Sequence, residues 1–206
     1  RRFVGMPMNG ELLELLDAAA RKDPAAPALL APGRAPLDYG SLRDHVGHVA
    51  AGLRAGGLGP RSRIATVLRN GPEAAASAFA VAATATCVPL NPAYGEAEFR
   101  FYLDGAARAA DAAAAAVDAK PADDVALILH TSGTTARPKI VPLSQANLAA
   151  SARSIARHLA LDPGDRGLNV MPLFHIHGLV GSMLATIAAG ASLVCTPGFD
   201  DERFFE

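Results

Sequence analysis

Cysteine and long apolar runs are both scarce in this sequence, and their scarcity excludes several classes of protein. The two cysteines, Cys87 and Cys195, lie far apart in apolar, strand-like surroundings. We therefore expect two reduced, buried thiols rather than a disulfide, which fits a cytoplasmic protein. No segment reaches the roughly 18 consecutive apolar residues that span a bilayer, and residues 1–5 lack the apolar core of a secretory signal.

An excess of charge of one sign is missing too. The net charge at pH 7 is −1, and neither sign gathers in a long run. This removes the electrostatic argument for binding nucleic acid or an anionic membrane surface. Half of the 206 residues are hydrophobic, so the chain can bury a substantial core as one large domain or two small ones.

Two common nucleotide-binding signatures are also absent. A Walker A loop needs Gly-x-x-x-x-Gly-Lys followed by Ser or Thr, but here Pro138 precedes Lys139 and Ile140 follows it. The sequence therefore disfavours mononucleotide kinases and GTPases. No Gly-x-Gly-x-x-Gly follows the first strand, which argues against a Rossmann dehydrogenase.

What is present is an alternation of strand-like and helical segments. Apolar strands are predicted at 28–31, 63–68, 86–90, 125–129, 167–171 and 192–196, with a hairpin turn at 32–33 leading to a further strand at 36–39. Helices are predicted at 8–21, 42–55, 73–83, 96–103, 145–161 and 181–189. This alternation predicts an α/β fold of layered βαβ units with a mostly parallel sheet.

Capping residues define the predicted helix starts. Asn9 and Ser41 are expected to cap the first two helices, with Asp44 completing a capping box after Ser41. Pro72 fits the first position of the third helix, and Ser144 is a cap for the helix that runs to about 161. The inward face of that last helix is predicted to comprise Leu148, Ala152, Ile155, Ala156 and Leu159.

A hydroxyl-rich stretch follows the apolar run at 125–129 and His130. It consists of Thr131, Ser132, Gly133, Thr134 and Thr135. Open α/β sheets bind ligands at the carboxyl ends of their strands. Glycine lets backbone N–H groups converge on an anion, the hydroxyls add donors, and Lys139 adds a positive charge on a flexible stem. The stretch predicts a polyphosphate site, although an ordinary Ser/Thr/Gly surface loop is the alternative for any short polar segment.

A pair of alternate histidines, His175 and His177, is the second candidate for chemistry. Alternate residues of an extended segment share a face, so the pair could bind zinc, but the sequence places no third or fourth ligand near them. An ordinary core or loop histidine is the other interpretation. An imidazole can also hydrogen-bond a carboxylate, whether it is neutral or charged.

The segment from His130 to Ile140 resembles the phosphate-binding signature of the adenylate-forming superfamily, which includes acyl-CoA synthetases, luciferases and peptide-synthetase adenylation domains. That signature usually reads aromatic or His, then Thr-Ser-Gly-Thr-Thr-Gly-x-Pro-Lys-Gly. Ala136 and Ile140 replace the last two glycines, which lowers the backbone freedom of the loop. The resemblance implies that residues 131–135 and Lys139 hold the β- and γ-phosphates of ATP.

The stretch from Met171 to Leu179 resembles a second signature of the superfamily, a Pro-Leu-Phe-His-x-x-Gly element that lines the acyl-substrate pocket. The resemblance implies that His175 lies near the substrate carboxylate and that Gly178 belongs to the pocket. His177-Gly178-Leu179 is similar to the form found in ligases for short dicarboxylates. Together with residues 130–131 and 141–145, it makes the oxalyl-CoA synthetase group the nearest match.

The first half of the chain resembles the superfamily's amino-terminal region, with short motifs in the expected order at 37–39, 56–60, 63–65 and 88–92. We expect a first α/β subdomain at 1–103, an alanine-rich bridge at 104–120 and a second α/β segment at 121–206. Members of the superfamily usually carry several dozen more residues at the bridge, including a strand and a helix. Either that unit has been lost or residues are missing there; a helical linker with its own role is a further alternative.

The activity that the resemblance implies is that of a carboxylate–CoA ligase, with ATP, Mg²⁺ and coenzyme A as cofactors and a small carboxylate as substrate. No side-chain cluster for a metal is predicted, so Mg²⁺ is expected to arrive with ATP. The superfamily's later Tyr-Gly-x-Thr-Glu segment and its mobile carboxy-terminal domain do not occur by residue 206. We therefore expect the front part of an enzyme, incomplete for catalysis. The rival interpretation is a non-catalytic module that keeps the fold and binds a nucleotide or a partner.

Overall fold

The computed structural model describes residues 10–115, 125–131, 139–202 and 204. Its elements follow one another along the chain as α1 (Glu11–Lys22), β1 (Pro27–Leu30), β2 (Leu37–Asp38), α2 (Tyr39–Ala55), β3 (Arg63–Thr66), α3 (Pro72–Ala82), β4 (Thr86–Pro89), α4 (Glu96–Ala115), β5 (Val125–Thr131), β6 (Lys139–Ser144), α5 (Gln145–His158), β7 (Arg166–Asn169), the π-helix η2 (His177–Leu184), α6 (Ala185–Ala189) and β8 (Ser192–Cys195). The predicted alternation of strands and helices is confirmed.

The strands form two four-stranded sheets. The upper sheet has the order β3-β4-β5-β6, and the lower sheet has the order β2-β1-β8-β7. Within each sheet two neighbouring pairs are parallel and one outer pair, β5–β6 or β1–β2, is antiparallel. The fold is therefore α/β with mostly parallel pairing, as predicted. Each sheet takes two strands from each half of the chain, which joins the halves through the pairs β1–β8 and β4–β5.

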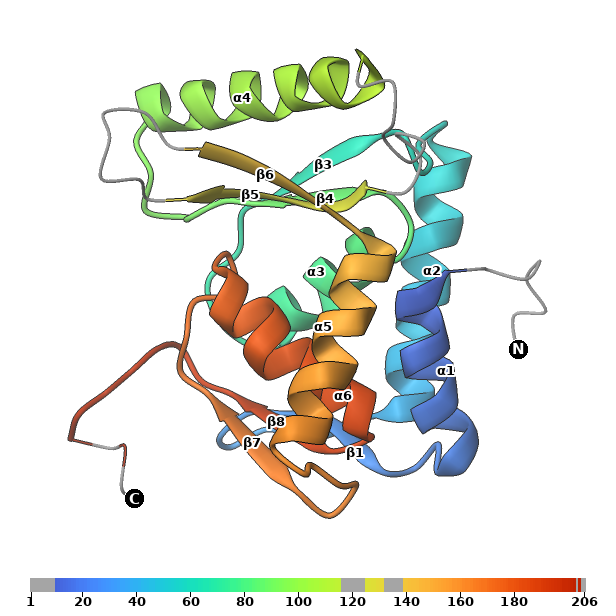
Figure 1. Cartoon of the computed structure of the whole chain (residues 1–206). Helices are drawn as coiled ribbons and strands as arrows, with labels where there is room; N and C mark the ends of the chain where they lie inside the picture. Colours follow the sequence, from blue (N-terminus) through green and yellow to red (C-terminus); the bar gives the residue numbers. More distant parts are fainter. Residues whose placement is uncertain (1–9, 116–124, 132–138, 203, 205–206) are drawn as a thin grey trace.

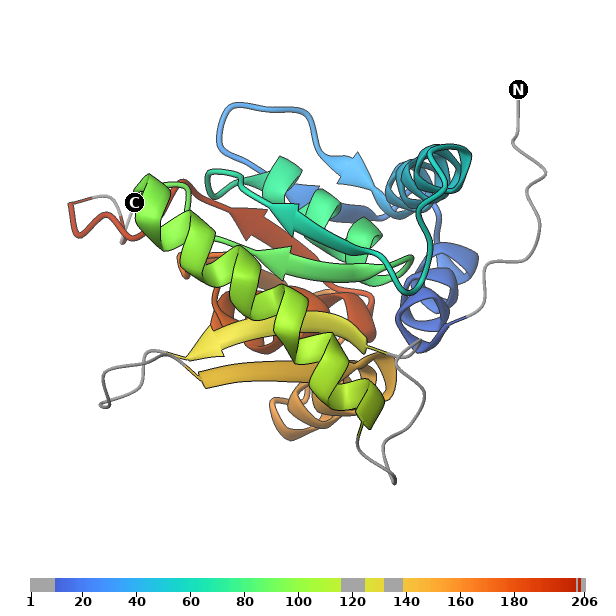
Figure 2. The same ribbon diagram turned by 90° about the horizontal axis from the view of Figure 1, so that it is seen from above.

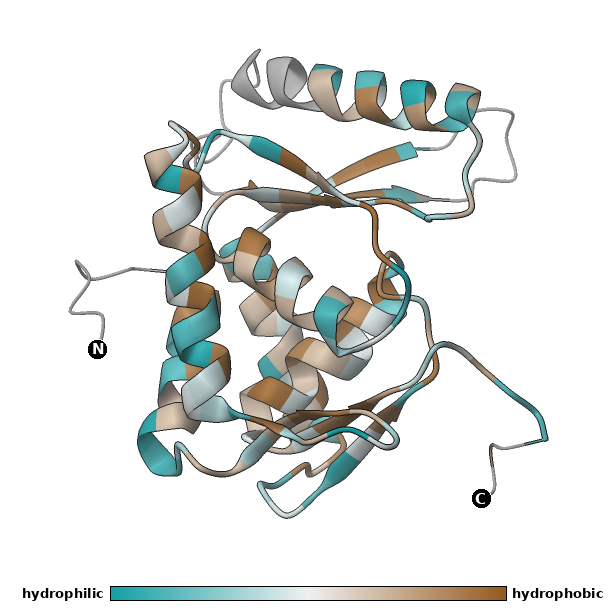
Figure 3. Cartoon of the chain, turned by 180° about the vertical axis from the view of Figure 1, so that it is seen from behind, coloured by the Kyte–Doolittle hydropathy of each residue, from teal (hydrophilic) through white to brown (hydrophobic). Residues whose placement is uncertain are grey.

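The elements are arranged in layers. Helices α3, α5, η2 and α6 lie between the two sheets, α1 and α2 stand beside them, and α4 covers the outer face of the upper sheet (Figure 1). Seen from above, α4 crosses the strands of the upper sheet (Figure 2). Hydrophobic residues lie on the strands of both sheets and on the helices between them (Figure 3). The main core therefore sits in the helical layer and on the two sheet faces that enclose it.

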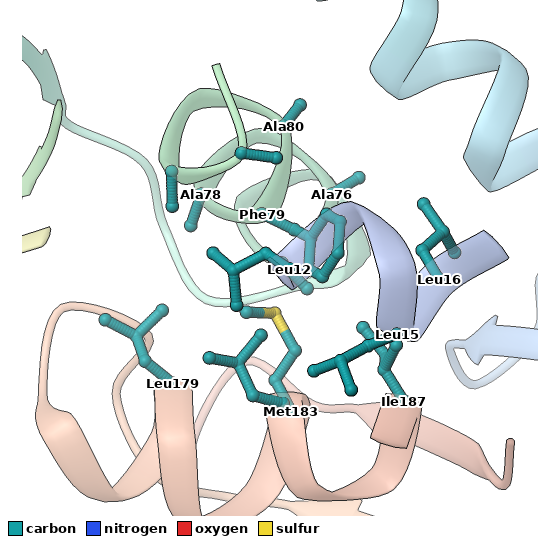
Figure 4. Close-up of a cluster of buried hydrophobic side chains, with 14 of the residues drawn as sticks. Leu12, Leu15, Leu16, Ala76, Ala78, Phe79, Ala80, Leu179, Met183 and Ile187 are labelled. Atoms are coloured by element: carbon teal, nitrogen blue, oxygen red, sulfur yellow. The ribbon is translucent and has the colours of Figure 1, made fainter. Parts of the chain in front are cut away.

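Most residues of the α3 helix are buried. It contacts β3, β4 and β5 of the upper sheet and β8 of the lower sheet. Six of its residues are buried alanines, and its one aromatic residue, Phe79, is 1% exposed. Phe79 points into a cluster with Leu12 of α1 and Met183 of η2 (Figure 4). Small side chains let the helix backbone approach both sheets closely, which a helix with larger residues could not do.

Two of the predicted caps are confirmed and one is wrong. Ser144 and Asn147 form a capping box at α5, and Pro72 occupies the first turn of α3. The second helix, however, begins at Tyr39, because the Asp38 carboxylate accepts the Ser41 N–H at 2.6 Å and acts as the cap that Ser41 was expected to be. Asn9, expected to cap the first helix, lies outside the described residues, and the N-cap there is Gly10.

The α2 helix starts earlier than predicted because of a contact with a distant part of the chain. The Tyr39 side chain is 1% exposed, and its hydroxyl donates to the Ala191 carbonyl at 2.7 Å. This bond fixes Tyr39 at the first helical position beside the lower sheet, so the residue before it becomes the cap. At the end of α5 the prediction for Leu159 is wrong: the helix ends at His158, and Leu159 is 59% exposed.

The α4 helix is longer than predicted. It was expected to cover 96–103, but it continues to Ala115, through most of the alanine-rich stretch. Alanine has the highest helix propensity, so a run of alanines extends a helix that has already begun. Residues 116–124 lie outside the described part of the chain. The division of the chain at 104–120 stays a prediction.

Both cysteines are free and buried, as predicted. Burial disfavours the thiolate and raises the pKa of Cys87 and of Cys195 to about 12. Among the helices within the described ranges, none has the length and apolar character needed to cross a bilayer.

Phe79 tests the role of the helical layer. Replacing it with alanine leaves a cavity between the sheets, so Phe79→Ala is expected to lower the free energy of unfolding by about 3–5 kcal/mol, measured by urea denaturation. The matched control is Leu159→Ala, because Leu159 is 59% exposed and surface changes stay within about 0.5 kcal/mol. Similar losses in the two variants would show that the core does not centre on α3.

Candidate functional site

The β5–β6 hairpin carries the ends of the predicted phosphate loop. β5 lies between β4 and β6, with its residues from Ala126 to Leu129 buried. Its last residue, Thr131, is the Cα partner of Lys139, the first residue of β6. The hairpin therefore brings Thr131 and Lys139 opposite each other at the carboxyl end of a central strand, where open α/β sheets bind ligands. Ser132, Gly133, Thr134 and Thr135 lie outside the described residues.

His130, just before the loop, packs against aromatic residues that lead to α4. Its ring makes an edge contact with Tyr102 at 4.6 Å between centroids, and Tyr102 stacks on Tyr94 at 4.7 Å. No described residue hydrogen-bonds the buried Nε2 atom. Burial disfavours the imidazolium and lowers the pKa of His130, against a smaller opposing effect of a hydrogen bond to the Tyr102 backbone. The ring therefore acts as a neutral packing residue at the base of the loop.

Ile140, where the resembling signature has glycine, has a packing role. Its side chain packs against a small cluster under α4 that includes Val88, Ala106 and Ile128. A Cβ at Gly105 of α4 would lie 3.0 Å from the Ile140 Cδ1 atom, so the missing side chain of Gly105 makes room for Ile140. This contact fixes the start of β6, and with it Lys139, against α4.

The second predicted site residue, His175, lies in the turn between β7 and η2. Its N–H donates to the Pro172 carbonyl at 3.1 Å, and its own carbonyl accepts the Leu179 N–H at 3.0 Å. The side chains of His175 and His177 are exposed. Gly178 is buried, and a Cβ there would overlap the Pro172 carbonyl oxygen. Glycine is therefore the residue that lets η2 begin against this turn.

The helix after this turn starts earlier than predicted and is unusual. Helix was expected from 181, but η2 begins at His177 and has π-helical hydrogen bonds; such segments occur often at functional sites. A Cβ at Gly181 would lie 3.2 Å from the His177 ring, so that ring lies over η2. Within the described ranges, no three His, Cys, Asp or Glu side chains form a group that could hold a metal ion.

An asparagine in the turn before α3 contacts the segment that leads to His175. Asn70, between β3 and α3, donates from Nδ2 to the Met171 carbonyl at 2.9 Å, and its Oδ1 accepts the Leu173 N–H at 2.8 Å. The signal in the sequence is weak: an Asn before Gly-Pro predicts a turn, and nothing in it indicates a partner 100 residues away.

The two parts of the site face the same side of the molecule. The end of β5, the start of β6 and the start of η2 lie on that side in both views (Figures 1 and 2). The loop ends at the upper sheet and the turn before η2 beside the lower sheet thus lie on one side of the molecule.

Known proteins share both the fold and the sequence pattern of this chain. The fold is that of adenylate-forming enzymes: ATP-bound MatB from Rhodopseudomonas palustris superposes with a TM-score of 0.77 and 28% identity over 93% of this chain and 46% of that one. The sequence model of the family described as AMP-binding enzyme matches residues 16–109 and 103–206. This chain belongs to the AMP-binding enzyme family.

Two curated relatives are similar in sequence. An oxalate–CoA ligase of Arabidopsis thaliana is 35% identical over 224 residues, which cover 87% of this chain and 44% of the relative. An oxalate–CoA ligase of Saccharomyces cerevisiae is 51% identical over 83 residues, 40% of this chain and 15% of the relative. The chain therefore spans less than half the length of the curated relatives it matches.

The alignments also bear on the alanine-rich stretch. The alignment with the Arabidopsis protein is longer than this entire 206-residue chain although it covers only part of it, so the relative carries residues that this chain does not. The family match is split into two segments that meet at 103–109, inside α4. The expectation that a unit is missing near this helix stays a prediction.

The half-buried His130 predicts a pH dependence of stability. Above the ordinary imidazole pKa of 6.5 the ring is neutral whether the protein is folded or unfolded. As the pH falls below that value, the unfolded chain takes up a proton before the folded one, because the folded pKa is lowered, and stability is lost. Urea denaturation at pH 7.5 and 5.5 is expected to show a smaller loss in His130→Gln than in the parent.

The control for this experiment is His45→Gln, because His45 is exposed on α2. That variant is expected to keep the full pH dependence of the parent. An unchanged pH dependence in His130→Gln would contradict the burial argument.

Proposed function

We propose that this chain is the amino-terminal part of an ATP-dependent carboxylate–CoA ligase that acts on a short dicarboxylate such as oxalate. One observation carries the proposal: in a member of the AMP-binding family, Thr131 and Lys139 stand opposite each other at the end of β5, and the turn that leads into η2 lies on the same side of the molecule (Figure 1). A cation and a hydroxyl-rich loop suit a polyphosphate, and an exposed imidazole suits a carboxylate.

The proposed reaction has two steps. A carboxylate oxygen attacks the α-phosphorus of ATP, the bond to the β-phosphate breaks, and an acyl-adenylate and pyrophosphate form. The thiol of coenzyme A then attacks the acyl carbon and releases AMP. The contribution of this chain belongs to the first step, where positioning and charge neutralisation lower the barrier.

In this proposal Lys139 and the loop hydroxyls of 131–135 hold the β- and γ-phosphates. Lys139 is exposed at the start of β6, with its strand fixed by Ile140 under α4. Mg²⁺ would arrive with ATP and neutralise charge on the phosphates. A cytoplasmic location, where ATP and coenzyme A are both available, fits the two free thiols.

The choice of oxalate is supported by similarity. The two relatives described above are oxalate–CoA ligases, and the stronger identity, 51%, covers 83 residues. Neither His175 nor His177 is buried, so both imidazoles are accessible. A dicarboxylate offers a second anionic group beside the reacting one, and an imidazole can bind it by a charge-assisted hydrogen bond.

A second candidate is a nucleotide-binding module without ligase activity. The packing of Ile140 under α4 fixes the base of a loop that is glycine-rich in the resembling signature, and a fixed loop favours binding over turnover. The two candidates differ in whether a carboxylate binds together with the nucleotide.

Lys139 provides the direct test of phosphate binding. Lys139→Ala is expected to weaken MgATP binding by about tenfold or more, because a charge-assisted bond contributes about 1.5–3 kcal/mol. Isothermal titration of this chain measures the affinity. Lys22→Ala is the matched control, since Lys22 lies exposed in the last turn of α1. Equal affinities of the two variants would overturn the assignment of the hairpin as a phosphate site.

His175 provides the test of the acid. With a non-hydrolysable ATP analogue bound, oxalate is expected to bind more tightly than acetate, and His175→Ala is expected to remove about tenfold of that preference. His158→Ala, in the last turn of α5, serves as the control. Binding of the nucleotide without any acid would favour the second candidate.

A further inference from the structure

Asn70 joins two segments that are far apart in the sequence. Its side-chain amide bonds the Met171 carbonyl and the Leu173 N–H, which lie 101 and 103 residues away. These two backbone groups flank Pro172, which has no N–H of its own. The amide therefore pairs with 171–173 as a neighbouring strand would, with one donor and one acceptor. A flipped amide would lose both bonds, so the network fixes its orientation.

A second asparagine reinforces one of these bonds. Asn169, the last residue of β7, donates from Nδ2 to the Met171 carbonyl at 3.1 Å. Its side chain is 1% exposed, and no described residue bonds its Oδ1 atom. A buried acceptor without a partner is unfavourable. An apolar residue would suit stability better at this strand position, so the amide is better explained by the bond it makes to Met171.

Both bonds of the Asn70 amide go to residues far along the chain rather than to its own turn. Asn often caps helices, yet the N-cap of α3 is Gly71, and no side chain caps that helix. By contrast, Asn91 before α4 bonds the Ala93 N–H two residues on, as turn asparagines commonly do. The Asn70 amide instead bonds the turn that follows β7.

The bonds continue from Asn70 to the candidate acid site. The Pro172 carbonyl, between the two groups that Asn70 holds, accepts the His175 N–H, and the His175 carbonyl accepts the Leu179 N–H of η2. Gly178 packs against the Met171 and Pro172 carbonyls from the other side. The backbone of His175 is thus held through Pro172 on one side and η2 on the other.

We propose that Asn70 is a positioning residue for acid recognition: its amide holds the turn of residues 171–175 so that the His175 imidazole meets the substrate carboxylate. The proposal rests on the proposed function of His175. In this proposal the turn between β3 and α3 contributes to the acid site, although that site lies beside the other sheet.

The experiment compares Asn70→Asp with Asn91→Ala in this chain. Asn70→Asp keeps the shape and the acceptor for the Leu173 N–H but replaces the donor to the Met171 carbonyl with an oxygen. With a non-hydrolysable ATP analogue bound, oxalate affinity is expected to fall about tenfold in Asn70→Asp, while affinity for the analogue stays within about twofold. Asn91→Ala is expected to change neither, because its amide bonds only its own turn.

Two further measurements separate positioning from general damage. Hydrogen exchange at the Leu173 and His175 amides is expected to be about tenfold faster in Asn70→Ala, and the His175 ring signals in NMR spectra are expected to shift. Equal losses of oxalate and analogue affinity, or unchanged exchange and ring signals, would overturn the proposal.

The same measurements distinguish its failure from that of the proposed function. If the parent chain binds no oxalate, the proposal that oxalate is the substrate is wrong. The positioning role is then decided by exchange and ring signals alone: a change confined to 171–175 supports it, and no change refutes it.

Discussion

The packing of α3 between the two sheets sets the geometry on which the rest depends. Buried alanines cover the helix, and it touches three strands of the upper sheet and one of the lower sheet. Because a helix of small residues lets backbones approach closely, both sheets pack directly against α3. The turn before α3, which carries Asn70, is thereby brought to the turn that follows β7.

The candidate site combines parts of two sheets, which come from segments far apart in the sequence. The upper sheet supplies the hairpin with Thr131 and Lys139, and the turn after the lower sheet supplies His175. Each edge is supported from behind: α4 packs on Ile140 and His130, and the Asn70 amide holds the backbone before His175. Such support is what a binding site needs in order to keep its groups in place before the ligand arrives.

Much of the fold could be predicted because its signals are local. The apolar run at 125–129 indicated a buried strand, Ser144 indicated the start of α5, and Gly190 ends α6 in the left-handed conformation that favours glycine. One error arose where a distant contact outweighed local preference: Asp38 displaced Ser41 as a cap because the Tyr39 hydroxyl bonds Ala191. The extension of α4 has a local cause, the helix propensity of its alanines.

The amino-acid sequence by itself determined the family, the α/β alternation and the residue types of the candidate site, since motifs and periodicity are properties of neighbouring residues. Tertiary structure alone decided that Lys139 faces Thr131 across a hairpin and that Ile140 fills the space left by Gly105. It also decided that the Asn70 side chain bonds a turn about a hundred residues later in the sequence. The physical reason is that a hydrogen bond or a packing contact depends on distance in space, which no spacing along the chain specifies.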